Sequence, residues 1–247
     1  MFPSITIQEG ALFIADAHDS TQRHFFLDFL HEIKQNPPPQ LFLMGDMFDL
    51  LVGGIAYRVK KYQPYIDLIN EISHVCEIVY FEGNHDFNLS KLFLHVKVVP
   101  IENQPLTCRL PDGNVCLVSH GDRYGGKLHS VYTALIRHKG ILKVLGCIDI
   151  LLKGAISTRI EVNQRQKNLC KKIITFEKIV NDKLHHYPLL GVDCIVEGHY
   201  HQGNTFVMNG VKYINFSSFA CNQSYFCVQS SPKTEFVPVQ YLSRPKQ

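Results

Sequence analysis

Five short blocks of side chains that commonly bind metal ions recur along this 247-residue chain. Each block contains aspartate, asparagine or histidine and follows an apolar run that is typical of a β-strand. The blocks are Asp16-Ala17-His18, Gly45-Asp46-Met47-Phe48-Asp49, Gly83-Asn84-His85-Asp86, His120-Gly121-Asp122 and Gly198-His199-Tyr200-His201. Carboxylate and amide oxygens mixed with imidazole nitrogens suit a divalent ion such as Mn, Fe or Zn better than calcium. One block alone is weak evidence, but five in this order predict a metal centre assembled from strand-end loops.

The spacing within the blocks suggests how two ions would be shared. Asp16 and His18 stand two apart at a strand end, where alternate side chains point to the same side, so both could bind one ion. Asp46 has two carboxylate oxygens and could bridge two ions. The neutral amide of Asn84 would limit the negative charge around the second ion.

His199 and His201 also share a side, so they would either clamp one ion or each reach a different one. Two divalent ions about 3.5–4 Å apart would lower the pKa of a shared water and stabilise the charge that builds on a phosphoryl group. Such hydrolysis needs no nucleophilic serine or cysteine. The blocks therefore predict metal-assisted hydrolysis of a phosphate ester.

Other polar residues near the blocks have simpler explanations. Eight of the 13 histidines lie outside the blocks and are left unassigned. Asp19, Asp86 and Asp122 stand beside or within the blocks, and we expect them to make helix caps and turn hydrogen bonds.

Strand and helix patterns alternate along the first part of the chain. We expect strands at residues 11–15, 40–44, 76–81, 96–99, 115–119 and 193–197, and helices at about 20–34 and 56–74. This alternation predicts a sheet with parallel β-α-β connections. Short strands then follow closely at residues 205–208, 211–216, 225–229 and 235–241. Asn209-Gly210 between the first two predicts a hairpin.

Residues 122–188 interrupt this scheme as a basic, helical insertion within a single domain that spans residues 1–247. Residues 121–190 hold 13 Lys and Arg against 5 Asp and Glu, whereas the rest of the chain holds 12 against 17. A basic segment inserted in an acidic body indicates an anionic partner: a phosphate-bearing substrate, an anionic lipid surface or nucleic acid.

Residues 141–156 are expected to form one moderately amphipathic, basic helix. The apolar arc comprises residues 141, 144, 145, 148, 151, 152, 155 and 156, with Leu142 and Ile150 outside it. The opposite, polar side carries Lys139, Lys143, Asp149 and Lys153. Gly146 and Gly154 weaken this helix by about 1 kcal/mol each relative to alanine. Two interpretations stay open: a helix packed on the body, or a lid whose apolar side meets acyl chains or a membrane surface.

Composition excludes some classes of protein. An apolar fraction of 45% indicates a globular core. Eight cysteines without close spacing indicate free, mostly buried thiols in a reducing cytoplasm. The first residues lack a basic and then apolar leader, so we expect no signal peptide. The chain contains no apolar run of about 18 residues, so we expect no membrane span.

The motif order D-x-H, G-D-x-x-D, G-N-H-D, H-G-D and G-H-x-H resembles that of the calcineurin-like metallophosphoesterases, from about residue 11 to residue 217. The resemblance implies an α/β fold, a four-layer α/β/β/α sandwich with a helical lid insertion. It also implies a dinuclear site at the strand ends. Carried over by position, the first metal ligands are Asp16, His18 and His201, and the second are Asn84, His120 and His199, with Asp46 bridging.

The same resemblance gives His85 a catalytic role on the substrate phosphate and leaving group, oriented by Asp49. A carboxylate beside this imidazole would raise its pKa and fix its tautomer. The implied cofactors are two divalent ions, with Mn first and Mg, Fe or Zn as alternatives.

Within the family, the layout is similar to that of the UDP-2,3-diacylglucosamine hydrolases of lipid A synthesis. Those enzymes cleave a pyrophosphate to UMP and 2,3-diacylglucosamine 1-phosphate. Their best-known branch has Arg where this chain has His85, so the chain resembles a divergent branch. The implied partners are a UDP-linked diacylated glucosamine and, peripherally, the cytoplasmic face of the inner membrane. Basic residues of the insertion expected to bind substrate are Arg123, Lys127, Arg137 and Arg159.

Other functions remain to be tested against this one. A soluble phosphomonoesterase or nucleotide pyrophosphatase would share every metal ligand and differ in the insertion. A nuclease is disfavoured and no nucleic acid partner is expected, because no aromatic-rich basic stripe is present to stack bases. A non-catalytic scaffold would be expected to have lost ligands, and here every expected position is filled.

Overall fold

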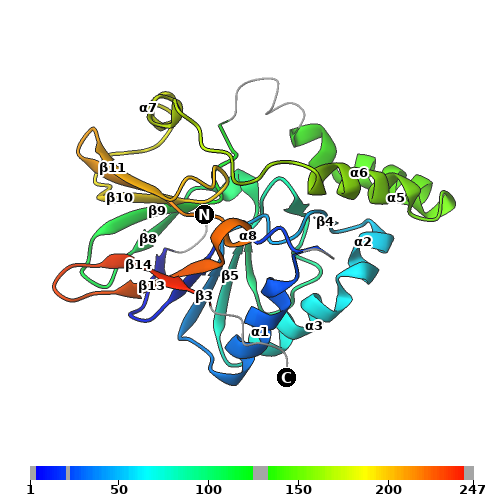
Figure 1. The fold of residues 1–247 in the computed structure, drawn as a ribbon, viewed down its shortest axis with the longest axis horizontal. Helices are drawn as coiled ribbons and strands as arrows, with labels where there is room; N and C mark the ends of the chain where they lie inside the picture. The colour runs from blue at the N-terminus through cyan, green and yellow to red at the C-terminus, as the bar shows by residue number, and fades with distance from the viewer. Residues whose placement is uncertain (1–3, 21–22, 125–132, 242–247) are drawn as a thin grey trace.

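Two six-stranded sheets packed face to face form the body of the protein (Figure 1). The computed structural model describes residues 4–20, 23–124 and 133–241. The first sheet has the order β14-β13-β2-β3-β5-β7 and the second β1-β8-β9-β10-β12-β11. The first-sheet strands are β2 (Leu12–Ile14), β3 (Gln40–Leu43), β5 (Glu77–Phe81), β7 (Lys97–Val99), β13 (Ser224–Gln229) and β14 (Glu235–Gln240). The second-sheet strands are β1 (Ile5–Thr6), β8 (Leu106–Arg109), β9 (Val115–Ser119), β10 (Cys194–Glu197), β11 (Asn204–Met208) and β12 (Val211–Asn215).

Helices cover the outer faces of both sheets. The helices include α1 (Phe25–Gln35), α2 (Ala56–Lys61), α3 (Gln63–Ile72), α5 (Lys139–Leu151), α6 (Ala155–Arg165), α7 (Phe176–Leu184) and α8 (Phe219–Asn222), of which α1 and α3 cover the first sheet and α7 covers the second. A 3₁₀ turn, η1, spans Ile101–Asn103, and a small sheet pairs β4 (Leu51–Val52) with β6 (Asp86–Phe87). In Figure 1, α1 and α3 lie below the first sheet, α7 lies above the second, and α5 and α6 extend to the right.

Three apolar clusters separate these layers. Between the sheets, Phe13 of β2 packs in one cluster with Val118 of β9, because alternate side chains of each strand point inward. The outward-facing Leu43 of β3 lies in the cluster of the α1 and α3 side chains. On the other outer face, Ile195 of β10 packs with Val180 of α7. The layers are therefore α/β/β/α, which confirms the predicted sandwich.

Strand directions also agree with the sequence. The strands β2, β3, β5 and β7 are parallel neighbours, as are β9, β10 and β12. The pair β11 and β12 is antiparallel, and its turn residues Asn209 and Gly210 have φ of 53° and 81°. Positive φ at both central positions is what a tight hairpin turn requires.

Two predicted helices have different limits in the structure. The first begins at Phe25 and not near residue 20. The helix expected over residues 56–74 is divided at Tyr62 into α2 and α3. Pro64 stands in the first turn of α3, where its missing N–H is tolerated, but its ring would clash inside a continuous helix.

The helix expected over residues 141–156 was also predicted wrongly. The helix α5 ends at Leu151, Gly154 adopts φ of 79°, and α6 starts at Ala155. The buried residues of α5 are Leu142, Gly146 and Asp149, whereas most of the expected apolar arc is exposed. Asp149 is buried because its carboxylate accepts hydrogen bonds from the Ser157 N–H (2.9 Å) and hydroxyl (2.8 Å).

Gly146 explains how α5 lies so close to the body. A Cβ at this position would stand 2.7 Å from the carbonyl oxygen of Gly54, so only glycine permits the approach. The apolar arc is left facing away from the core. Its exposed large side chains, together with Ile160 of α6, are called the apolar face: Val144, Leu145, Ile148, Leu151, Leu152, Ile156 and Ile160.

The cysteines differ from the sequence-based expectation as well. Cys170 and Cys221 form a disulfide between residues 51 apart, with a Cα–Cα distance of 5.7 Å. The other six are free thiols, and Cys76, Cys108, Cys116 and Cys194 are buried as expected. The pairing was missed because tertiary folding, and not sequence spacing, brings the two residues together.

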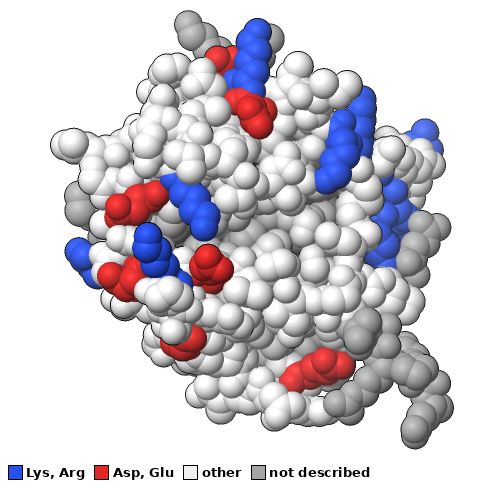
Figure 2. Space-filling view, turned by 60° about the vertical axis from the view of Figure 1, so that its left-hand side comes forward, with Lys and Arg blue, Asp and Glu red and all other residues white. Residues whose placement is uncertain are grey.

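The surface and the helices add two observations. Acidic and basic side chains occur together on the left of the face shown in Figure 2, so the charge asymmetry along the chain does not give a single-sign surface there. Among the helices of the described residues, none combines the length and apolar character needed to cross a membrane.

Candidate metal centre

The five sequence blocks meet where parallel strands end. Asp16, Asp46 and Asn84 follow β2, β3 and β5, which are adjacent and parallel. His120 and His199 follow β9 and β10, a parallel pair in the second sheet. Because the carboxyl ends of parallel strands share one edge, the loops of both sheets converge on one place.

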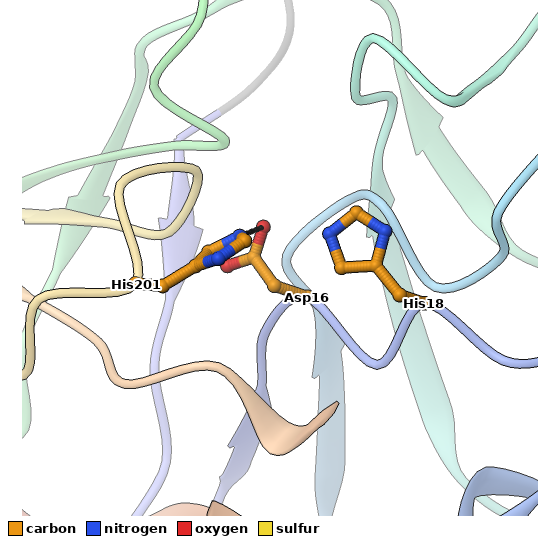
Figure 3. A group of neighbouring side chains, drawn as sticks. All are labelled: Asp16, His18 and His201. Carbon is orange, nitrogen blue, oxygen red and sulfur yellow. Dashed lines mark ion pairs between the residues drawn. The ribbon is translucent and has the colours of Figure 1, made fainter. Parts of the chain in front are cut away.

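Asp16, His18 and His201 form a first group whose ligand atoms all lie within 4.8 Å of one another. The Nε2 atom of His201 is 3.1 Å from the Asp16 carboxylate. In Figure 3 the three side chains turn toward a common space, although they come from two distant loops. The structure therefore brings together the residues predicted for the first metal.

Asp46, His120 and His199 form a second group within the same limit, and His18, Asp46 and His85 form a third. His18 and Asp46 each belong to two groups, so the groups make one continuous cluster. The Asp46 Oδ2 atom is 3.5 Å from His120 Nε2 and 3.9 Å from His85 Nε2. This central position is the one that a bridging carboxylate would need.

Several potential ligand atoms are buried without a hydrogen-bond partner. Over the described residues these include both ring nitrogens of His18, Asn84 Oδ1, His120 Nε2 and His201 Nε2. Buried polar atoms nearly always have a hydrogen-bond partner, so several unpaired atoms in one place indicate a ligand-binding site. Oxygen and imidazole donors of this kind fit divalent ions, and the residues present therefore fit the predicted pair of metals.

Backbone carbonyls fix which nitrogen each histidine presents. His120 Nδ1 lies 2.8 Å from the carbonyl oxygen of Met44, and His201 Nδ1 lies 2.7 Å from that of Leu169. A carbonyl can only accept, so each Nδ1 carries the hydrogen and Nε2 is left to bind a metal. Such outer contacts hold metal-binding rings in place.

Five of the predicted ligands have a left-handed backbone. The φ angles are 53° at Asp16, 41° at His18, 53° at Asp46, 62° at His199 and 59° at His201. Each such conformation costs about 1–3 kcal/mol for a residue with a Cβ, and such strain gathers at functional sites. Strand alternation is thus not what aligns Asp16 with His18, because both lie beyond the end of β2.

Gly198 is needed for a close approach between two of the loops. A Cβ on Gly198 would lie 2.6 Å from Asp16 Oδ2, and the next residue's N–H donates to the same carboxylate. The glycine of the fifth block therefore lets the loop after β10 pass directly over the first ligand.

Charges within the cluster set the protonation of its members. Burial would raise the pKa of Asp46, but His85 and His120 outweigh it and hold the pKa below its ordinary value. Burial and His85 lower the pKa of His18, and burial and His120 lower that of His199 to about 3. Asp46 is thus a carboxylate and His18 and His199 are neutral imidazoles, the forms that bind metals.

Asp86 supports the cluster and does not join it. Its carboxylate accepts hydrogen bonds from the N–H groups of Gly83 (3.0 Å), Asp46 (2.9 Å) and Met47 (2.6 Å), and from the Tyr80 hydroxyl (2.7 Å). Asp86 therefore ties the second block to the third, as its expected role in turn bonds implied. Burial and the nearby Asp46 raise its pKa to about 7.

His85 and Asp49 are in contact, but through an unexpected atom. His85 Nδ1 lies 2.9 Å from the backbone carbonyl oxygen of Asp49. The Asp49 carboxylate instead binds Arg23 at 2.7 Å and stands 3.8 Å from Arg165 Nε. Both arginines were missed in the sequence, where nothing marks them as neighbours of the second block.

The four basic residues predicted to bind substrate have different surroundings. Arg137 is buried and donates to the Gly83 carbonyl (2.6 Å) and to Glu82 (3.1 Å), so it supports the third block, and its contact with substrate stays a prediction. Arg123 donates to the carbonyl of Gln104, and Arg159 is exposed on α6. Lys127 lies outside the described residues. Substrate contacts by Arg123 and Arg159 stay predictions.

An apolar cavity of about 180 Å³ borders the cluster at Asn84. It lies between β4, β6 and the helices α5 and α6. Its lining comprises Leu50, Val52, Ile55, Asn84, Phe87, Ile136, Leu142, Leu145, Asp149, Ile156, Ser157, Ile160 and Gln164. The sequence indicated an apolar insertion but not a cavity next to a predicted metal ligand.

A curated relative matches part of the chain. The UDP-2,3-diacylglucosamine hydrolase of Tolumonas auensis is 30% identical over 116 residues, which cover 45% of this chain and 46% of that protein. Over these residues the match agrees with the predicted resemblance to the UDP-2,3-diacylglucosamine hydrolases. The match spans about half the length of the relative. No family model matches the chain.

Solved structures of similar outline share little sequence with the chain. An archaeal phosphodiesterase is 12% identical, with 93% of this chain and 98% of that chain covered and a TM-score of 0.43. A dimetal phosphatase from Danio rerio is 12% identical, with 95% and 99% covered and a TM-score of 0.43. A phosphoesterase from E. coli is 14% identical, with 93% and 97% covered and a TM-score of 0.41. At these scores the likenesses add nothing to the fold described above.

Proposed function

We propose that the chain is a metal-dependent hydrolase that cleaves the pyrophosphate of UDP-2,3-diacylglucosamine to UMP and 2,3-diacylglucosamine 1-phosphate. The observation that carries the proposal is the apolar cavity beside Asn84, which joins the ligand cluster to α5 and α6. A substrate with a phosphate at the cluster and an acyl chain in the cavity fits both. Partial similarity to a hydrolase of this substrate supports the assignment.

The seven predicted ligands would divide between two divalent ions. Asp16, His18 and His201 would hold one, Asn84, His120 and His199 would hold the other, and Asp46 would reach both. Manganese is our first choice, with Mg, Fe or Zn as alternatives, because this ligand set is permissive. When bound, the ions would lower the pKa of a water and stabilise charge on the phosphoryl group.

His85 would act on the substrate through Nε2. Its Nδ1 is held by the Asp49 carbonyl, which turns Nε2 toward the cluster, 3.9 Å from Asp46. From there a protonated His85 would donate to the leaving oxygen of the pyrophosphate. Because the carbonyl fixes the orientation of the ring, Nε2 is already in place to act on the substrate when it binds.

Arg23 and Arg165 would help to bind the pyrophosphate. Arg23 binds the Asp49 carboxylate at 2.7 Å, and Arg165 lies 3.8 Å from Asp49 and 4.0 Å from Glu161, beside the cluster. Both side chains are about one fifth exposed and so remain in reach of a substrate. Arginine suits this task because its planar fork can bind two phosphate oxygens.

Residues 122–188 would form a lid over the lipid part of the substrate and touch the cytoplasmic face of the inner membrane. The apolar face of α5 and α6 is exposed, and the exposed fraction of Leu151 is 79%. Lys143 lies on α5 and Lys153 lies between α5 and α6, and their positive charge would favour an anionic membrane surface. Together these features fit peripheral binding, with the acyl chains of the substrate drawn from the bilayer.

The test is an assay of UMP release from detergent-dispersed UDP-2,3-diacylglucosamine with added Mn, Mg or Zn. UDP-N-acetylglucosamine is the matched substrate, since it keeps the UDP-sugar but lacks the long acyl chains. We expect release from the lipid substrate at least tenfold faster. Equal rates on both substrates, or turnover of soluble dinucleotides alone, would replace the lipid reaction by that of a soluble phosphoesterase.

A further inference from the structure

We propose that the Cys170–Cys221 disulfide is a positioning element of the metal position formed by Asp16, His18 and His201, and that a dithiol reductant weakens metal binding there. The inference rests on the metal centre proposed above. It gives the chain a response to redox conditions that neither its motifs nor its relative suggest.

One end of the disulfide lies next to the support of His201. The Leu169 carbonyl, which holds the His201 ring at 2.7 Å, belongs to the residue just before Cys170. Leu169 lies between α6 and α7, where the chain forms no helix or strand from residue 167 to residue 173. A carbonyl in an irregular segment needs outside contacts to keep its direction.

The other end lies next to the support of Asp16. Cys221 belongs to α8, and the Ser218 hydroxyl just before that helix donates to the Asp16 carbonyl at 2.7 Å. The Ala220 N–H donates to the same oxygen at 3.2 Å. These bonds hold a backbone whose φ of 53° is unfavourable for aspartate.

The disulfide therefore joins the segment that supports His201 to the segment that supports Asp16, and these two side chains contact each other. His201 and Asp16 approach to 3.1 Å, and their supporting segments are fixed at a Cα–Cα distance of 5.7 Å between Cys170 and Cys221. Without the covalent bond, the Leu169 carbonyl and α8 would no longer be tied directly to each other. The distance between the two ligands would then vary more than a metal position tolerates.

Loss of the disulfide would be a local event. Gln202 also fastens the irregular segment, because its side-chain oxygen accepts from the Ile173 N–H at 2.9 Å. Its backbone carbonyl accepts from Lys172 Nζ at 2.6 Å. The segment thus stays attached when the disulfide opens, and the expected change is in ligand geometry and not in folding.

The disulfide is accessible to a reductant. Cys170 is exposed and Cys221 is half-buried, and both border a hollow of about 800 Å³ that also reaches His201. A thiolate of the dithiol would attack the exposed Cys170 sulfur and release the Cys221 thiolate, which takes up a proton. The second thiol would then displace Cys170, so two electrons and two protons pass to the chain and the reductant becomes a disulfide.

The experiment measures Mn²⁺ binding to the whole chain by the electron paramagnetic resonance signal of free Mn²⁺. Metal-free protein is titrated after oxidation, after reduction with the dithiol removed by anaerobic desalting, and as the double variant Cys170→Ser/Cys221→Ser. We expect two tight sites in the oxidised chain. One of them should weaken about 10- to 100-fold in the other two samples, the range seen when a ligand loses its support. Reoxidation should restore it in the wild type only.

The matched control is Cys147→Ser, which removes the exposed free thiol of α5 and should respond to the dithiol as the wild type does. Circular dichroism checks that every sample is folded. Equal binding of two ions in oxidised and reduced protein would overturn the proposal, as would global unfolding on reduction. An oxidised chain that binds no metal would instead overturn the proposed function, and this inference with it.

Discussion

The ring of His85 is held by the backbone carbonyl of Asp49, across 2.9 Å, while the Asp49 carboxylate pairs with Arg23. The support of the proposed catalytic histidine thus does not depend on the aspartate side chain. Any residue with the same backbone would supply it. This separates two roles that the sequence motif alone assigns to one carboxylate.

Asp49→Asn should therefore reduce activity less than His85→Ala. Asparagine keeps the backbone carbonyl but lacks the negative charge that faces Arg23 and Arg165, so we expect less than a tenfold loss in kcat. His85→Ala removes the proposed acid and should cost about 10²- to 10⁴-fold. Steady-state rates of UMP release check both. If the two variants are equally impaired, the carboxylate itself takes part in the reaction.

Asp46→Ala should remove metal from the chain. Asp46 lies in two of the three ligand groups, so its loss weakens both positions. We expect at least one ion fewer per chain by plasma mass spectrometry, and hydrolytic activity at background. Asp67→Ala, on the outer helix α3, is the control and should keep full metal content. Unchanged metal content in Asp46→Ala would be evidence against the dinuclear site.

Gly198→Ala should disturb the first metal position without unfolding the protein. The added methyl would stand 2.6 Å from Asp16 Oδ2, so the carboxylate or the loop after β10 must move. We expect at least tenfold weaker metal binding there, measured by Mn²⁺ titration. Gly140→Ala is the matched control, because its methyl meets only the side chain of His138. Normal binding by Gly198→Ala would show that the close approach is dispensable.

Glu197 predicts a pH dependence of stability. Burial would raise its pKa, but the ammonium of Lys183 at 2.6 Å and the Tyr187 and Tyr213 hydroxyls lower it below the ordinary value of 4.5. A lowered folded-state pKa stabilises the protein fully above pH 4.5, and that contribution is lost as the pH falls through the folded-state value.

Glu197→Gln should accordingly lower the free energy of unfolding by about 3 kcal/mol at pH 7, because it leaves Lys183 buried without its counter-charge. Urea unfolding of both metal-free proteins from pH 7 to pH 3 measures the difference. The difference should shrink only below pH 4.5. A difference that already disappears between pH 7 and pH 5 would contradict the lowered pKa.

The apolar face of α5 and α6 should bind membranes. Leu151→Glu places a charge on its most exposed side chain, so we expect at least a fivefold loss of binding to anionic phospholipid vesicles in flotation assays. Val207→Glu is the control, since Val207 is also exposed (71%) but lies on β11 in the second sheet. Equal binding by the wild type and Leu151→Glu would remove the membrane contact from the proposal.

Much of the architecture could be predicted because it depends on local patterns. Buried runs such as residues 40–43 and 115–119 read as strands, and Asn209-Gly210 fixed a hairpin through its backbone preference. Short strands such as Ile5–Thr6 were missed, since two residues carry no periodicity. The apolar arc of α5 did not predict which residues are buried, because periodicity locates an apolar side of a helix but does not say what covers it.

The sequence by itself determined the kind of chemistry, because ligand types and their order after strands are local properties of the chain. Only the tertiary structure decided how the ligands are held. The Leu169 carbonyl behind His201, the Asp49 carbonyl behind His85 and the Cys170–Cys221 disulfide join segments far apart in the chain. Such contacts arise from backbone atoms or long-range packing, and neither leaves a signature in the order of the residues.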